Sequence, residues 1–380
     1  MLQINPKLSV EKISIFSTIA QLCSKHNAIN LGQGFPDFDV SPELKGRVVH
    51  YLKQNKDQYT PMAGIPELRN ILAKKYTSAY KTAVDPDDNI TITAGATQAI
   101  FTCIQSVVLP EDEVIIIEPA YDSYAPSIEI AGAKGIPILL NADFSMNWDA
   151  VQKAVTTKTK MIIFTNPHNP TGQVWSDDDF LALSQIVKNT DILLLSDEVY
   201  EHIIFDGNKH LSLLDYPTLS QRGFATYSFG KTFHATGWKM GYVIAPERLT
   251  RAMRNIHQWN VFSVNSFLQY ALADYLKDPY TYHNLSSFYQ SKRDFFQNEM
   301  ASSRFKSIST KGSYFQLYDY SAISDLEDID FTKWLIEEHG VATIPISPFC
   351  SKDSDWKVIR LCFAKKEDTL SKAVKRLQKV

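Results

Sequence analysis

Short runs of consecutive apolar residues alternate with longer helical patterns through the first 250 residues of the chain. Seven runs have the composition of strands, at residues 89–95, 113–119, 135–141, 160–167, 191–198, 224–230 and 241–246. Helix candidates between them include "TQAIFTCIQSVV", "DDDFLALSQIVKNT" and, before the first run, "SPELKGRVVHYLKQ". Several runs are apolar at every position, so both faces of these strands are expected to be covered. The pattern predicts an α/β fold with a mostly parallel, seven-stranded sheet sandwiched by helices.

The pattern changes near residue 280. A long amphipathic helix is expected over 283–303, followed by strands at 313–321, 341–347 and 356–364 and by helices at 330–340 and 367–380. These elements predict a smaller α+β domain. We therefore expect a large domain at residues 46–279, a small domain at 280–380, and an N-terminal segment, 1–45, whose helix near 11–28 packs with the small domain.

Composition narrows the class of protein. The chain has 380 residues, 44% of them hydrophobic and 21% charged, with a net charge of -3. This balance is typical of soluble globular proteins and gives no basic footprint for nucleic acid. The four cysteines are scattered, so neither a metal site nor a disulfide framework is expected. No signal peptide or membrane-spanning run is evident, and we expect a cytoplasmic protein.

Polar side chains follow five of the predicted strands. In a sheet of this kind, ligands bind beyond the carboxyl ends of the strands. The segments found there are Gly95-Ala96-Thr97, Glu118-Pro119-Ala120-Tyr121, the run from Asn166 to Gly172 that contains Asn169, Ser196-Asp197-Glu198-Val199-Tyr200, and Ser228-Phe229-Gly230-Lys231. A helix start, an aromatic ring, a carboxamide, a carboxylate, a phenol and an amine are thus expected to meet at one edge of the sheet.

Each segment also has a simpler interpretation. "AGATQ" is a plain helix start, Tyr121 a packing aromatic, and Asp197 a helix cap. "NPHNPTG" has the chemistry of a tight turn, and Lys231 could be a snorkelling surface lysine.

One ligand accounts for all of these segments together. Pyridoxal phosphate needs a lysine for a Schiff base, an acid for its pyridine nitrogen and an anion cradle for its phosphate. No GxGxxG occurs for a dinucleotide, and "SFGKT" lacks the first glycine of a P-loop.

The chain resembles the fold-type I, class I/II aminotransferases over essentially its whole length. It is most similar to the branch that contains kynurenine aminotransferases and bacterial methionine aminotransferases. The resemblance rests on "INLGQGFPDFD", "QYTPMAGIPELR", "TAGATQA", "EPAYDSY", "NPHNPTG", "SDEVYEHI", "SFGKTFHATGWKMGY" and "IRLCFAKKEDTL". It implies a pyridoxal-phosphate enzyme that exchanges an amino acid and a 2-oxo acid by a ping-pong mechanism.

The resemblance also implies a role for individual residues. Lys231 matches the Schiff-base lysine that shuttles a proton, and Asp197 the partner of the pyridine nitrogen. The other expected cofactor contacts are Tyr200 and Asn169 on the phenolic oxygen, Tyr121 stacked on the ring, and Gly95, Ala96, Thr97, Ser228 and Lys239 around the phosphate. Lys239 stands where many relatives have arginine, so the charge is kept and the bidentate fork is lost. Cis bonds are expected before Pro119 and Pro170.

Further matches concern the substrate and the partner subunit. Arg360 matches the arginine that holds the substrate α-carboxylate, and Gly34 lies in a segment that closes over the substrate. Asn169 and Phe262 are also expected to contact the substrate. Tyr59 matches a tyrosine that reaches the phosphate of the neighbouring subunit, so we expect a homodimer with shared active sites.

The substrate side chain is expected to be large and uncharged. Relatives specific for dicarboxylates carry a second arginine, supplied by the partner subunit, after the lysine-bearing strands. Residues 258–276 contain no lysine or arginine and include Trp259, Phe262 and Phe267. Methionine and aromatic amino acids are therefore favoured, with kynurenine and glutamine as further candidates; interface packing is an equal interpretation of Trp259.

A cysteine-S-conjugate β-lyase on the same fold is the alternative to an aminotransferase. A transcription regulator is disfavoured because no DNA-binding region is evident.

Overall fold

The computed structural model describes residues 6–9, 13–351, 354 and 356–380. In these ranges the strands form three sheets, of seven, four and two strands. Residues 11 and 12 of the expected N-terminal helix lie outside the described residues. Among the described residues, no helix is both long enough and apolar enough to cross a membrane.

The large sheet contains all seven strands that the sequence predicts. In spatial order these are β2 (Ile90–Thr93), β8 (Gly241–Ile244), β7 (Gly223–Ser228), β6 (Leu193–Asp197), β5 (Thr159–Thr165), β3 (Glu113–Glu118) and β4 (Lys134–Leu139). Strand β8 is antiparallel to both of its neighbours, and the pairs from β7 across to β4 are parallel. The prediction of a mostly parallel sheet is confirmed.

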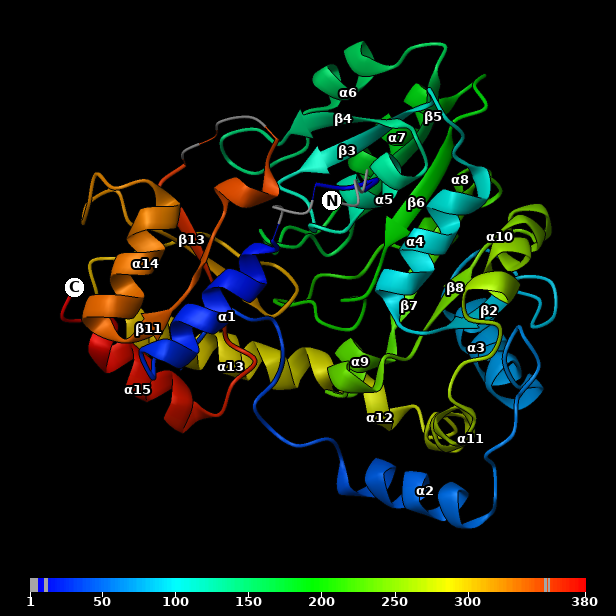
Figure 1. The fold of residues 1–380 in the computed structure, drawn as a ribbon, viewed down its shortest axis with the longest axis horizontal. Helices are drawn as coiled ribbons and strands as arrows, with labels where there is room; N and C mark the ends of the chain where they lie inside the picture. Colours follow the sequence, from blue (N-terminus) through cyan, green and yellow to red (C-terminus); the bar gives the residue numbers. More distant parts are fainter. Residues whose placement is uncertain (1–5, 10–12, 352–353, 355) are drawn as a thin grey trace, which may run out of the picture.

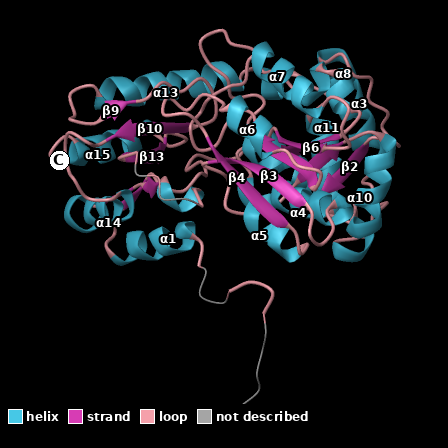
Figure 2. Cartoon of the chain, turned by 90° about the horizontal axis from the view of Figure 1, so that it is seen from above, coloured by secondary structure: helices cyan, strands magenta, loops and turns pink. Residues whose placement is uncertain are grey.

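Helices cover both faces of this sheet, as Figure 2 shows. One layer contains α4 (Ala96–Val107), α5 (Tyr124–Ile130) and α10 (Glu247–Asn260); the other contains α3 (Pro66–Ala79), α6 (Trp148–Ala154), α7 (Asp177–Val187), α8 (Pro217–Ser220) and α11 (Ser266–Tyr275). Along β3, Val114 and Ile116 join the core under the first layer, and Ile115 and Ile117 join the core under the second. The strands are therefore apolar at consecutive positions because each face meets its own helix layer.

The C-terminal part of the chain builds the second sheet, on the left in Figure 1. Its strands are β12 (Ile344–Pro345), β13 (Val358–Cys362), β10 (Phe315–Asp319) and β9 (Lys306–Ser307), and its helices are α13 (Leu285–Met300), α14 (Asp328–His339) and α15 (Glu367–Leu377). Helix α1 (Ile15–Lys25) contacts α14, and β1 (Ile29–Asn30) pairs with β11 (Val341–Ala342). The division of the chain into domains at residues 45 and 279 stays a prediction.

Two predicted strands differ from the structure. The run 341–347 is split at Thr343 into β11 and β12, which pair in different sheets. The run 224–230 ends at Ser228, and α9 (Phe229–Thr232) follows it. The Ser228 hydroxyl accepts a hydrogen bond from the backbone N–H of Lys231 at 3.4 Å. Lys231 therefore lies in a helical turn and not at a strand end, because the serine acts as a cap. Helices α2 (Pro42–Lys53) and α12 (Tyr280–His283) complete the α-helices described.

Candidate active site

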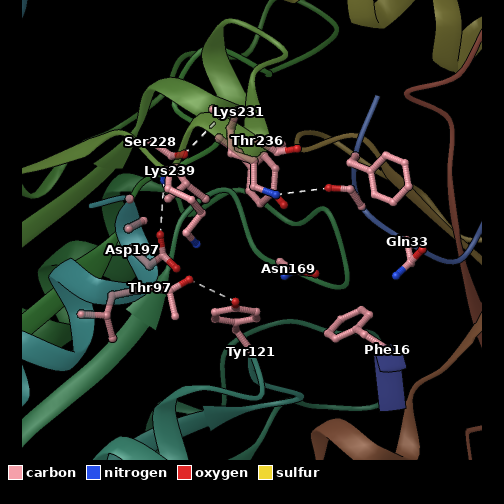
Figure 3. Close-up of a pocket in the computed structure, with 18 of the residues that line it drawn as sticks. Phe16, Gln33, Thr97, Tyr121, Asn169, Asp197, Ser228, Lys231, Thr236 and Lys239 are labelled. Atoms are coloured by element: carbon pink, nitrogen blue, oxygen red, sulfur yellow. Dashed lines mark hydrogen bonds between the residues drawn. The ribbon is translucent and has the colours of Figure 1, made fainter. Parts of the chain in front are cut away.

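A cavity of about 280 Å³ opens where the carboxyl ends of the parallel strands meet, and we call it the rim cavity. Its wall contains twelve of the fourteen residues singled out from the sequence: Gly34, Gly95, Ala96, Thr97, Tyr121, Asn169, Asp197, Tyr200, Ser228, Lys231, Lys239 and Arg360. Figure 3 shows Lys231, Lys239 and Asp197 on one side and Phe16 and Gln33 opposite them. Strand β8 is antiparallel to its neighbours, so its start lies at the edge of the sheet where the parallel strands end. Lys239 comes just before the start of β8 and therefore reaches this same edge.

Lys231 is the amine of this cavity. Its Nζ donates hydrogen bonds to the Tyr314 hydroxyl at 2.9 Å and to the Gly34 carbonyl at 3.2 Å. The Tyr314 hydroxyl donates in turn to the Gly34 carbonyl at 2.6 Å. Burial lowers the pKa of Lys231 from 10.5 to about 8. About a tenth of this lysine is therefore neutral and nucleophilic at pH 7, far more than for a solvated lysine.

Asp197 is the acid of the cavity and ends β6. Its carboxylate accepts hydrogen bonds from the Tyr124 hydroxyl at 2.7 Å and from the Val199 N–H at 3.3 Å. Burial raises the pKa of Asp197 to about 6, and the bonds from Tyr124 and Val199 oppose that rise. The side chain is ionised at neutral pH and has lost most of its water, so a cationic partner would be bound strongly.

One corner of the cavity is suited to an anion. Helix α4 begins there directly after Gly95, which has φ 82° and ψ 168° and provides no side-chain cap. The first N–H groups of such a helix have no partner within the helix, and the helix dipole adds positive potential. Ser228 and Lys239 line the same corner, and a Cβ built on Gly95 would lie 3.5 Å from Cε of Lys239.

Arg360 lies on β13 and also lines the rim cavity. It is 1% exposed, and its guanidinium donates to the Asn169 side-chain carbonyl at 2.8 Å and to the Gly32 carbonyl at 2.9 Å. Its Nε has no hydrogen-bond partner among the described residues. The guanidinium carbon lies 3.9 Å from the ring centre of Phe315 and 5.3 Å from that of Phe16. A buried cation with an unused donor is a strong site for a carboxylate.

The aromatic residues of the cavity complete its walls. The Tyr121 hydroxyl lies 3.3 Å from the Thr97 hydroxyl, and Nζ of Lys231 lies 5.7 Å from the ring centre of Tyr200. Burial raises the pKa of Tyr200 although Arg360 opposes the shift, so its hydroxyl is a donor at neutral pH.

Tyr59 and Phe262 are the two singled-out residues that do not line the rim cavity. Tyr59 is 84% exposed and Phe262 46% exposed, and their rings meet edge to face with centres 5.5 Å apart. Tyr59 was expected at the phosphate of the neighbouring subunit and Phe262 at the substrate, and both expectations stay predictions.

Sequence reasoning missed several contributors, of which Tyr314 and Tyr124 make the shortest polar contacts. Tyr124 is in the quoted segment "EPAYDSY" and Tyr314 precedes β10, yet neither was given a role. Phe16, Gln33, Phe35 and Phe315 also line the cavity and were missed. The peptide bonds before Pro119 and Pro170 are cis as expected, and the bond before Pro167 is also cis.

The arrangement combines a buried amine, a buried carboxylate, an anion-binding corner and a carboxylate-binding arginine. These groups match the aldehyde, pyridine nitrogen and phosphate of pyridoxal phosphate and the carboxylate of an amino acid. Within the described ranges, no group of three or more histidine, cysteine, aspartate or glutamate side chains is placed to hold a metal ion.

Comparison with known proteins gives consistent matches over the whole chain. The model of the family "Aminotransferase class I and II" matches residues 26–377. Methionine aminotransferase of Escherichia coli (strain K12) is 44% identical, with 99% of each chain covered. Kynurenine–oxoglutarate transaminase 3 of Rattus norvegicus is 33% identical, covering 95% of this chain and 86% of that protein.

Solved structures agree with these sequence matches. A crystal structure from Escherichia coli that identifies a methionine aminotransferase function superposes with a TM-score of 0.96 at 44% identity, covering 100% of both chains. N-Succinyldiaminopimelate aminotransferase from Mycobacterium tuberculosis superposes with a TM-score of 0.94 at 32% identity, covering 99% of both chains.

Proposed function

Because the chain belongs to the class I and II aminotransferase family, we propose that its rim cavity binds pyridoxal phosphate and transfers an amino group from a large uncharged amino acid to a 2-oxo acid. The observation that carries this proposal is the pairing of Lys231, with a pKa of about 8, and Asp197, with a pKa of about 6, in one cavity. An amine that readily loses its proton near neutral pH and an ionised, desolvated carboxylate are the two groups that this cofactor requires.

The residues that would hold the cofactor fit its charge distribution. Lys231 would hold it through Nζ, and the Asp197 carboxylate would keep a proton on the pyridine nitrogen. The start of α4, Ser228 and Lys239 supply donors and positive charge for the phosphate. When bound, pyridoxal phosphate withdraws the electrons released at the substrate Cα.

The protein side chains then bind the substrate and move one proton. Arg360 binds the α-carboxylate with its forked donors, which fixes the direction of the Cα–H bond. Nζ of Lys231, once free, takes the proton from Cα and returns it on the cofactor side. A pKa near 8 suits this exchange because the amine can accept and release a proton near neutral pH.

The cavity favours a substrate with an uncharged side chain. Its cationic side chains are Lys231, Lys239 and Arg360, and the first two are assigned to the cofactor and the third to the α-carboxylate. Phe16, Phe35 and Phe315 line the remaining wall. A side-chain carboxylate would lose its water there without gaining a partner. With 44% identity to a methionine aminotransferase, methionine and the aromatic amino acids are the proposed donors, and kynurenine and glutamine are further candidates.

We also propose a homodimer in which each subunit contributes to both sites. Tyr59 and Phe262 form an exposed aromatic pair outside the rim cavity of their own chain, and Trp259, 85% exposed, lies near the end of α10, just before Phe262 in the sequence. Exposed aromatic residues grouped in this way are typical of protein interfaces.

A panel of amino donors tests the proposal. The purified holoenzyme is given methionine, phenylalanine, tyrosine, kynurenine, glutamine or aspartate with one 2-oxo acid, and the new amino acid is measured. Methionine or an aromatic donor should give the highest kcat/KM. A preference for aspartate would overturn the substrate class, and pyruvate release from cystathionine faster than amino transfer would indicate a β-lyase instead.

A further inference from the structure

A second cavity, of about 710 Å³, lies on the other side of the segment that follows β6. It is larger than the rim cavity, at about 280 Å³, is open to solvent on one side, and is bounded by α3, residues 201–202 and the connection between α11 and α12. Helices α3 and α11 lie side by side in Figures 1 and 2 and contact one another. The residues that matter most for its chemistry are Lys74, Lys75, Tyr80, Glu201, His202 and Tyr282.

The floor of this cavity is a buried ion pair. Lys75 Nζ donates to Oε1 of Glu201 at 2.8 Å, and the Tyr76 hydroxyl donates to the same oxygen at 2.7 Å. Burial alone would raise the pKa of Glu201, but the charge of Lys75 and its hydrogen bond to the carboxylate hold the pKa below its usual range. The carboxylate is therefore ionised, and its charge offsets that of Lys75.

Nδ1 of His202 has no hydrogen-bond partner among the described residues. Nε2 of His202 lies 2.9 Å from Lys75 Nζ and 3.2 Å from Oε1 of Glu201. The Lys75 ammonium already donates to this Glu201 oxygen, and it donates to Nε2 as well, because an ammonium group cannot accept. Burial lowers the pKa of His202, so the ring is neutral and carries its proton on Nδ1. Its polar contacts among the described residues run through Nε2. The Nδ1–H group remains available to a ligand.

Three lysines line the cavity, and the charge of Lys74 is the one that no ion pair within the described ranges balances. Lys277 is held by Asp274 at 2.9 Å, and Lys75 by Glu201, whereas Lys74 is exposed and its ammonium forms no ion pair within the described ranges. The walls between these charges are apolar or aromatic and include Ile71, Leu276 and the rings of Tyr80 and Tyr282. Positive charge above an apolar wall is complementary to an anion with an apolar body.

We propose that this cavity, the Lys74–His202 cavity, binds a small organic monocarboxylate with an aromatic or aliphatic body. The carboxylate is bound by Lys74 and by the Nδ1–H of His202, and the apolar body packs against Tyr80 and Tyr282. The site adjoins the catalytic machinery without sharing it. Tyr200 lines the rim cavity, and the next two residues, Glu201 and His202, line this one.

Calorimetry with naphthoate as the probe tests the site. The holoenzyme carries Arg360→Met, so that the carboxylate-binding arginine of the rim cavity does not contribute. We expect saturable binding of one naphthoate per chain. Naphthamide, which has the same body and no charge, should bind about fivefold or more weakly.

Three substitutions in the same background locate the binding. Lys74→Glu reverses an exposed charge at the cavity and should weaken naphthoate binding by about tenfold. Ala79→Phe, also at an exposed position of α3, fills the cavity and should abolish binding. Lys158→Glu is the matched control, because this exposed lysine lies before β5 and not in the cavity wall, and it should leave binding unchanged.

Several results would overturn the proposal: no saturable binding, equal affinity for naphthoate and naphthamide, or affinity that Lys74→Glu and Lys158→Glu change equally. Retention of binding in Ala79→Phe would place the probe elsewhere and would also overturn it. If Ala79→Phe lowers the melting temperature, the comparison of Lys74→Glu with Lys158→Glu decides the question alone.

Discussion

At the scale of single residues, the rim cavity buries two ionisable groups, and burial disfavours the charged form of each. Burial lowers the pKa of Lys231 to about 8 and raises that of Asp197 to about 6. Each shift means that the charged form is less stable in the folded protein than in water. Such opposed shifts in one cavity are typical of catalytic sites, where reactivity is gained at the expense of stability.

The first prediction concerns the stability cost of Asp197. An unfolded aspartate titrates near 3.8 and the folded one at about 6, so the native state holds an extra proton between these values. Stability therefore falls as pH rises through this window. In the apoprotein, Asp197→Asn should raise the free energy of unfolding at pH 7.5 by about 1–3 kcal/mol. Urea denaturation of both proteins at pH 7.5 and pH 4 measures this increase in the free energy of unfolding. The increase should be smaller at pH 4, because folded Asp197 is then protonated and uncharged.

The same substitution should damage catalysis. Asparagine keeps the shape of Asp197 but carries no charge to hold a proton on the pyridine nitrogen. We expect kcat to fall by on the order of a hundredfold or more. Wild-type kcat in Asp197→Asn would contradict the assignment of this residue, even if the apoprotein is stabilised.

The second prediction concerns the pH at which Lys231 becomes reactive. The neutral amine is the nucleophile, and its fraction rises about tenfold per pH unit below the pKa. With a pKa of about 8, attachment of pyridoxal phosphate to the apoprotein should accelerate up to about pH 8 and then level off. The absorbance change on mixing gives the rate, and Lys231→Ala should show no borohydride-stable adduct. Continued acceleration to pH 10 would mean an ordinary, solvated lysine.

At the scale of elements, the cavity depends on how strands and helices end. The N-terminus of α4 is placed by Gly95, whose φ of 82° and ψ of 168° lie in a region open essentially to glycine alone. A Cβ there would make ordinary contact with Lys239, so the backbone conformation and not the available space requires glycine.

The third prediction follows from this backbone. Gly95→Ala should destabilise the protein by about 1–3 kcal/mol and weaken pyridoxal-phosphate retention, because the first N–H groups of α4 would shift. Gly46→Ala is the matched control: Gly46 lies inside α2, no atom lies within 4 Å of a Cβ added there, and the substitution should be neutral or stabilising. Thermal melts and equilibrium dialysis of the cofactor test both variants. Equal effects of the two would exclude a special role for Gly95.

The elements also show what the sequence could predict. All seven strands of the large sheet were predicted because consecutive apolar residues signal strands that are covered on both faces. Asp197 was predicted from its place after such a strand. Arg360 was identified only through family resemblance, because nothing in its own segment indicates that its side chain reaches Asn169 and the rim cavity. Tyr314 and Tyr124 were missed because their hydroxyls reach Lys231 and Asp197 across the fold, which spacing along the chain does not reveal.

At the scale of the whole molecule, the rim cavity is assembled from separate parts of the chain. Lys231 and Asp197 come with the seven-stranded sheet, Arg360 with the four-stranded sheet, and Phe16 with α1. The Gly34 carbonyl, from the segment after β1, accepts hydrogen bonds from both Lys231 and Tyr314. The arrangement of these parts fixes the distance between the amine and the carboxylate-binding arginine, and so the size of the substrate backbone that fits.

The fourth prediction tests whether a site also requires a second copy of the chain. Tyr59→Ala and Lys231→Ala should each be nearly inactive as homodimers, the first through weaker phosphate binding and the second through loss of the amine. If Tyr59 serves the partner's cavity, a mixed dimer contains one complete site. That site combines Lys231 of one subunit with Tyr59 of the other.

Unfolding and refolding an equal mixture of the two variants should produce the mixed dimer in half of the molecules. Since one site of its two is complete, about a quarter of the wild-type activity should return. Refolding each variant alone is the control and should restore none. If Tyr59 acted within its own chain, or did not act at all, every lysine-bearing site would behave as it does in the Tyr59→Ala homodimer, and mixing would add no activity.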